Sequence, residues 1–82
     1  MEYSANTSTQ LAKLLIGRRK SLKLTQKQTG ERVGILPKTI SSMENSLETC
    51  TIKSFLKLLS ALDLELVLRA KETPTASSEL EW

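Results

Sequence analysis

The residues best suited to contact a polyanion gather in one short stretch, from Leu36 to Ser46. A lysine can donate hydrogen bonds to guanine O6 and N7, serine hydroxyls can reach base edges, and an apolar side chain can touch a thymine methyl group. A second group begins at Thr25, where the N–H groups at the start of a helix would hold phosphate. The expected base contacts are Leu36, Pro37, Lys38, Ser41 and Ser42, and the expected phosphate contacts are Thr25, Gln26, Lys27, Asn45 and Ser46.

Two short helices joined by a tight turn would place these side chains on one surface. Thr25 and Gln28 have the types and spacing of a capping box at the start of the first helix. Gly34 suits the left-handed position just past a helix end, and Pro37 suits the first position of the next helix. The stretch Leu24–Asn45 therefore predicts a helix-turn-helix unit, which binds duplex DNA through its second helix.

Two further helices are predicted around this unit, one from about Thr9 to Leu22 and one from Ile52 to about Leu62. Residues 9–63 would then form an all-α domain of four helices. Arg19 and Glu44 both fall on positions that face the core, so we expect them to form a partly buried ion pair, the alternative being two separate solvated charges. The residues of the last helix expected to face inward are Ile52, Phe55, Leu56, Leu59 and Leu62.

Length and charge set limits on partners. The chain has 82 residues, enough for one small domain with a modest core. Its net charge of +3 is unevenly spread. Eight basic residues and one acidic residue lie from Lys13 to Lys38, whereas three acidic residues and no basic residue follow from Glu72 onward. The eight basic residues are Lys13, Arg18, Arg19, Lys20, Lys23, Lys27, Arg32 and Lys38. A basic body of this kind favours a polyanion partner.

The composition argues against an enzyme. Histidine is absent, which removes the commonest general acid and base, and no cluster of Cys, His or carboxylates has metal-ligand spacing. We therefore expect no catalytic residue, no metal and no cofactor. The single cysteine, Cys50, suits a reducing compartment, and we interpret it as a small semi-buried residue. The polar N-terminus lacks the apolar stretch of a signal peptide, so the expected location is the cytoplasm, with nucleoid association when DNA is bound.

The segment after the last helix has a different pattern. Leu64, Leu66 and Leu68 alternate with other residues, which indicates a strand over residues 64–71. No other segment could pair with it, so the expected partner is the same strand of a second copy, with Val67 also at the dimer interface. The alternative is that these residues extend the preceding helix.

The two ends of the chain are expected to be loosely structured. Residues 1–8 are predicted to be a flexible arm, and residues 72–82 a disordered tail. The tail ends with Leu80 and Trp82, whose apolar area suits docking to a partner. The alternative is a terminus without function.

The helix-turn-helix stretch resembles the repressor-like (Xre) family over roughly residues 10–63. The residues that carry this resemblance are Leu24-Thr25-Gln26 and Thr39-Ile40-Ser41 followed by Glu44. Two positions depart from the family pattern. Thr29-Gly30 stands where Leu-Ala is usual, so the helix is expected to lose some packing, and Leu36 stands where a polar cap is common, so the next helix is expected to start with a frayed turn.

Joined to the predicted strand and to the acidic tail ending in Leu80-Glu81-Trp82, the domain resembles the HipB-type antitoxins. That resemblance implies a homodimer that represses its own operon by binding operator DNA, and that neutralises a HipA-type serine/threonine kinase toxin. The likeness to repressor-like domains also agrees with the expected Arg19–Glu44 pair, since such domains often tie these two helices in this way. Two alternatives stay open: a stand-alone phage-type repressor, and a protein-binding adaptor that does not bind DNA.

Overall fold

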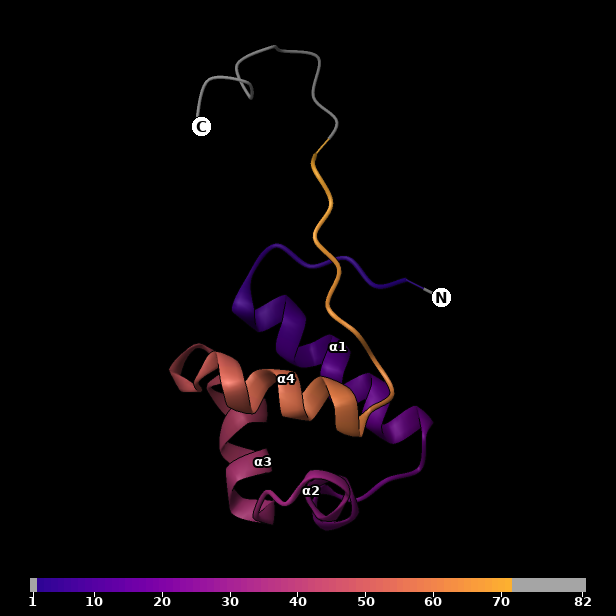
Figure 1. The fold of residues 1–82 in the computed structure, drawn as a ribbon, viewed down its shortest axis with the longest axis vertical. Coiled ribbons are helices and arrows are strands. Elements are labelled where there is room, and N and C mark those ends of the chain that lie inside the picture. Colours follow the sequence, from indigo (N-terminus) through magenta and orange to yellow (C-terminus); the bar gives the residue numbers. More distant parts are fainter. Residues whose placement is uncertain (1, 72–82) are drawn as a thin grey trace.

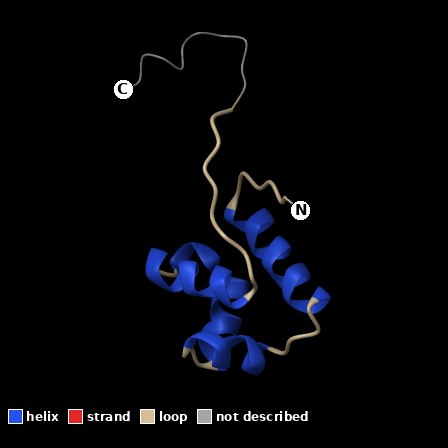
Figure 2. Ribbon diagram, turned by 45° about the vertical axis from the view of Figure 1, so that its right-hand side comes forward, coloured by secondary structure: helices blue, strands red, loops and turns tan. Residues whose placement is uncertain are grey.

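The computed structural model describes residues 2–71 and contains four α-helices and one short 3-10 turn. The elements are α1 (Ser8–Ser21), α2 (Gln26–Val33), α3 (Pro37–Asn45), η1 (Leu47–Thr49) and α4 (Ile52–Ala61). Figure 1 shows α2 and α3 packed together at one end of the domain, with α1 and α4 above them. Within the described residues every regular element is helical (Figure 2), which confirms the predicted all-α helix-turn-helix class.

Three of the helices begin with a threonine whose side chain accepts a backbone N–H bond. Thr7 accepts from Gln10, and Thr51 accepts from Ser54, each over 3.0 Å. Thr25 starts α2 with the predicted capping box, in which both reciprocal hydrogen bonds are present. In contrast, α3 begins after Leu36 with no side-chain cap, as expected from an apolar residue at that position.

The same three helices end in the same way, with one residue in the left-handed region. These residues are Lys23 after α1, Gly34 after α2 and Asp63 after α4, with φ between 57° and 74°. The next N–H then bonds back across six residues, as from Leu64 to the carbonyl of Leu59 over 2.8 Å. The left-handed Asp63 ends α4, so the alternative in which Leu64–Leu68 extend this helix is wrong.

Residues 64–71 leave the domain as a single extended run beside the N-terminal arm (Figure 1). An exposed ion pair of 3.3 Å joins Arg69 to Glu2 of that arm. The segment has neither helix nor strand pairing within the described part of the chain. A strand needs a neighbour for its backbone groups, so the predicted pairing across a dimer stays a prediction.

The core is mostly aliphatic, with Phe55 as an aromatic member, and it is built by α1, α3, η1 and α4. The largest apolar side chains below 2% exposed are those of Ile40, Leu58 and Leu62. Two residues expected to face inward do not, since Ile52 is 71% exposed and Leu56 is 44% exposed. Helical side chains lean toward the N-terminus, so Ile52 at the first position of α4 leans past the end of the helix. Leu56 stands at the edge of the face that Leu58 and its neighbours bury.

Thr29-Gly30, which stands where the family usually has Leu-Ala, packs closely against its neighbours instead of leaving the helix loosely packed. Thr29 is fully buried, and its hydroxyl donates to the carbonyl of Thr25 over 2.8 Å. A Cβ atom added to Gly30 would stand 2.0 Å from the carbonyl oxygen of Ile35, which is an impossible approach. The turn after α2 therefore requires glycine at this position.

Several sequence expectations concern residues outside the described range or outside the site. The tail residues Leu80 and Trp82 lie outside the described residues. Cys50 is half-buried against the core, and this burial raises the pKa of its thiol. In the range 2–71 no three potential ligand side chains gather as a metal site would require, and no helix there is long and apolar enough to cross a membrane.

Candidate nucleic-acid interface

The outer face of α3 presents the five residues expected to contact bases. Leu36 is 62% exposed, Pro37, Lys38 and Ser42 are also exposed, and Ser41 is half-buried. The opposite face of the helix is fixed in the core through two apolar residues, Ile40 and Met43, at 0% and 2% exposed. A helix anchored on one side and polar on the other has the form of a helix that enters the DNA major groove.

The residues expected to contact phosphate lie at the two sides of this face. Thr25, Lys27 and Asn45 are exposed, whereas Gln26 and Ser46 are half-buried. The Thr25 oxygen already accepts the Gln28 N–H, but its hydroxyl proton stays available for a phosphate oxygen. The first N–H groups of α2 point out of the helix beside these side chains, where an anion is favoured.

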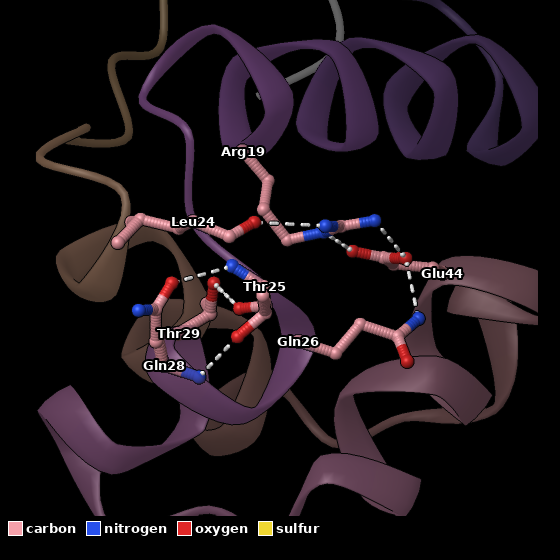
Figure 3. A network of polar contacts seen from close by, with 7 residues as sticks. All are labelled: Arg19, Leu24, Thr25, Gln26, Gln28, Thr29 and Glu44. Atoms are coloured by element: carbon pink, nitrogen blue, oxygen red, sulfur yellow. Dashed lines mark hydrogen bonds and ion pairs between the residues drawn. The ribbon is translucent and has the colours of Figure 1, made fainter.

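A buried polar network holds the two helices of the motif against α1 (Figure 3). The Arg19 guanidinium meets the Glu44 carboxylate at 2.6 Å and 3.3 Å, and its third contact is the Leu24 carbonyl at 2.9 Å. The two side chains are only 12% and 6% exposed. The expected ion pair is therefore present, and the alternative of two solvated charges is wrong.

Gln26 belongs to this network, which sequence reasoning missed. Its Nε2 donates to the Glu44 Oε1 over 3.0 Å, and Figure 3 shows the amide oxygen turned away from Glu44. One amide proton is thus used inside the protein, and the second is available to a phosphate. Eighteen positions separate Gln26 from Glu44, and no local pattern links them, so only the three-dimensional arrangement shows the contact.

The eight basic residues from Lys13 to Lys38 divide into two groups that the sequence could not separate. Three arginines bond within the protein: Arg19 to Glu44, and Arg18 and Arg32 to backbone carbonyls at the end of α4. The lysines instead are exposed and make no ion pair among residues 2–71. These lysines are Lys13, Lys20, Lys23, Lys27 and Lys38. Positive charge available to a polyanion is therefore carried by lysine.

The residues expected at a dimer interface are largely uncovered in the single chain. Leu64 is half-buried and packs against the core, while Leu66, Val67 and Leu68 are 53%, 68% and 89% exposed. They border an open groove of about 1000 Å³ between the N-terminal arm, α1, α4 and the segment 64–71. Within the single chain these consecutive apolar side chains remain in contact with solvent.

Comparison with known proteins gives a family for this geometry. Residues 15–68 match the family model described as Helix-turn-helix. Antitoxin HipB of Escherichia coli strain K12 is 33% identical over 78 residues, which cover 90% of this chain and 89% of that protein. Antitoxin HipB of Escherichia coli O6:H1 is 31% identical over 78 residues, covering 90% of this chain and 83% of that protein.

Solved structures agree with these relatives. A structure described as a HipB-O4 20mer complex is similar with a TM-score of 0.81 and 30% identity, covering 87% of this chain and 100% of that one. A HipA-HipB-O2-O3 complex gives the same TM-score of 0.81, with 30% identity and coverage of 87% and 100%. These matches each cover nearly nine tenths of the chain, and this chain belongs to the HipB antitoxin family of helix-turn-helix proteins.

Proposed function

We propose that this protein is an antitoxin and an autorepressor. As a homodimer it binds an inverted repeat in the operator of its own operon, and it forms a complex with a HipA-type serine/threonine kinase toxin. Its place of action is the cytoplasm, at the nucleoid when DNA is bound. The observation that carries the DNA-binding part is the exposed polar face of α3, held rigidly by the Arg19–Glu44–Gln26 network.

The α3 face enters the major groove in this account. Lys38 donates to guanine O6 and N7, Ser41 and Ser42 reach base edges, and the apolar pair Leu36 and Pro37 faces a thymine methyl group. Because Leu36 and Lys38 are exposed on the anchored helix, they need no rearrangement to reach a base. Because the face is already ordered before DNA binds, the entropic cost of association is lower.

Phosphate contacts on both sides fix the orientation of α3. Thr25, Gln26 and Lys27 at the start of α2 hold one strand, and Asn45 and Ser46 at the end of α3 hold the backbone on the other side. Gln26 is tied to Glu44 of α3, so the start of α2 and the recognition helix move as one body. A phosphate bound by the spare amide proton would therefore position α3 directly.

The dimer forms through residues 64–71. Leu66, Val67 and Leu68 are the exposed apolar residues of this segment, and pairing with the same segment of a second copy would cover them and satisfy the backbone groups. Leu64 joins the segment to the core. Two half-sites one or two helical turns apart then match the two recognition helices.

The toxin is bound in part through the tail. Leu80 and Trp82 are the apolar anchors, and Glu79 and Glu81 steer them toward a basic rim. The support is the sequence of the tail and the likeness to a HipB chain solved together with HipA. Trp82 is the only tryptophan, so a blue shift of its emission on adding a Trp-free toxin variant, lost in a chain that ends at Ser78, would support docking. Unshifted emission at saturating toxin would rule it out.

The DNA-binding proposal is tested with Lys38→Ala in a titration of the operator at fixed salt. We expect a loss of about 1–3 kcal/mol in binding free energy and relaxed specificity at one base position. Lys57→Ala removes the same charge from an exposed position of α4, so it serves as the matched control and should bind nearly as the parent does. Equal affinities for the Lys38→Ala variant and the parent would contradict the assignment.

A further inference from the structure

The C-terminal end of α4 is held by two arginines from other helices. The last carbonyl groups of a helix have no partner within it, and side chains, water or the residues that follow the helix must satisfy them. Here the Arg32 Nη1 donates to the Ala61 carbonyl over 2.9 Å, and the Arg18 Nε donates to the Leu62 carbonyl over 3.0 Å. Both contacts are partly buried, and Arg32 also approaches the Asp63 carboxylate at 3.5 Å.

These contacts fix the point at which the chain leaves the domain. Arg18 comes from the last turn of α1 and Arg32 from the last turn of α2. The left-handed Asp63 lies immediately beyond the two bonded carbonyls, and Leu64 returns its N–H to the Leu59 carbonyl over 2.8 Å. The direction of residues 64–71 is thus tied to α2, the helix that carries α3 through the turn at Gly34.

Residues 64–71 are long enough that a small change in the direction in which they leave α4 has a large effect at their far end. Eight extended residues reach about 26 Å at the usual rise of a strand. A swing of about 10° at the exit would move the far end by about 4–5 Å, which exceeds the rise of one base pair, about 3.4 Å. A small change at the end of α4 would therefore misplace the recognition helix of a second copy by more than one base step.

We propose that Arg18 and Arg32 are positioning residues that set the half-site spacing the dimer accepts. The inference rests on the proposed function, since it needs a dimer that joins through residues 64–71 and binds an inverted repeat. This proposal gives a structural role to two basic side chains that would otherwise be counted as phosphate ligands. Their guanidinium groups point to α4 carbonyls, so their charge acts on the geometry of the dimer.

The test is the binding of the full-length chain to inverted repeats whose half-site separation changes by single base pairs. In Arg32→Met and Arg18→Met the exit of residues 64–71 is no longer held, so the affinity for the best spacing should fall. If binding must restore the lost geometry at a cost equal to one charge-assisted hydrogen bond, the fall is about tenfold. The affinity for neighbouring spacings and for a single half-site should change far less, so the profile flattens. Lys57→Met removes the same charge from the exposed side of α4 and should keep the parental profile.

The other results would overturn the inference. An equal loss at every spacing would mean that the arginines only stabilise the fold, and an unchanged profile would mean that they do not set the spacing. The parent protein is measured first. If it binds DNA without any spacing preference, then the dimer geometry under "Proposed function" fails together with this inference, whereas a sharp parental profile leaves that proposal standing whatever the variants do.

A second measurement needs no DNA. Spin labels at Ser42→Cys, in a Cys50→Ser background, report the distance between the two recognition helices of the free dimer. Arg32→Met should broaden this distance distribution, and Lys57→Met should not. The Arg32 side chain is 44% exposed, so its replacement should leave the domain folded, as a urea melt would verify. Identical distributions in the two variants would reject the positioning role.

Discussion

The two ends of the domain differ in how fully a single chain pairs and buries its own side chains. Around α3, the buried charge of Glu44 is paired with Arg19 and Gln26, and no buried side-chain nitrogen or oxygen among the described residues lacks a partner. Beyond α4, in contrast, Leu66, Val67 and Leu68 remain exposed. A single chain thus completes the polar network behind α3, whereas the apolar side chains of the segment 64–71 stay exposed, and the proposed dimer would cover them.

The largest expected effect comes from breaking the network at the α3 end. Glu44→Ala would leave the Arg19 guanidinium, which is 12% exposed, without its counter-charge. We expect the free energy of unfolding to fall by about 3–5 kcal/mol, a large part of the stability of a small domain. Urea denaturation followed by circular dichroism measures this loss.

Two further variants identify the cause of that loss. Glu48→Ala removes an exposed acid from η1 and should change the stability by less than about 0.5 kcal/mol. The double variant Arg19→Met with Glu44→Met should recover most of the stability, because apolar replacements leave no unpaired charge. A double variant as unstable as Glu44→Ala would show that the unpaired charge is not the reason.

A smaller effect is expected at the turn between α2 and α3. Helix propensity alone predicts that Gly30→Ala would stabilise the protein by about 1 kcal/mol. The Ile35 carbonyl blocks the added methyl group, so we expect a net loss of about 1–3 kcal/mol instead. Gly17→Ala is the matched control, because nothing lies within 4 Å of its Cβ position in α1, and it should stabilise the protein. Equal signs for the two variants in thermal melts would refute the close contact.

The smallest effect concerns the uncapped start of α3. Leu36→Asn would supply an acceptor for the first N–H groups of the helix, and the extended backbone of Leu36 suits such a cap. We expect a gain of about 0.5–1 kcal/mol, seen as a rise of a few degrees in Tm for a domain of this size. Leu36→Ala lacks the acceptor and should show no gain. A rise of similar size in both variants would mean that removal of the exposed leucine, and not capping, is responsible.

Much of the α3 end could be predicted from sequence, because its signals are local. The capping box at Thr25, the left-handed Gly34 and the Pro37 start are fixed by neighbouring residues, and each is present. The Arg19–Glu44 pair was predicted because both charges fall on core-facing positions. Gly30 was misread as a weakness, since the approach of the Ile35 carbonyl depends on the path of the following turn.

The α4 end was less predictable, because its contacts join distant parts of the chain. Arg18 and Arg32 look like members of a basic stripe, and only the packing of α1 and α2 against α4 brings them to its last carbonyls. The inward face of α4 was misplaced for a related reason. Periodicity gives the width of an apolar face, but the neighbouring helices decide its centre, and here Leu58 is buried while Ile52 and Leu56 are not.

In the proposed dimer, residues 64–71 join two copies that each bring a complete DNA-binding face, and the variant Leu66→Glu is designed to separate the two copies. Leu66 is 53% exposed, so the charge should leave the folded monomer intact. Sedimentation of the full-length chain with an inverted-repeat duplex and with a single half-site gives the number of chains bound to each. We expect a parental dimer on the inverted repeat, and a monomeric variant that keeps the half-site affinity but loses cooperative binding. A Leu66→Glu variant that remains a dimer, or that loses half-site binding while still folded, would contradict it.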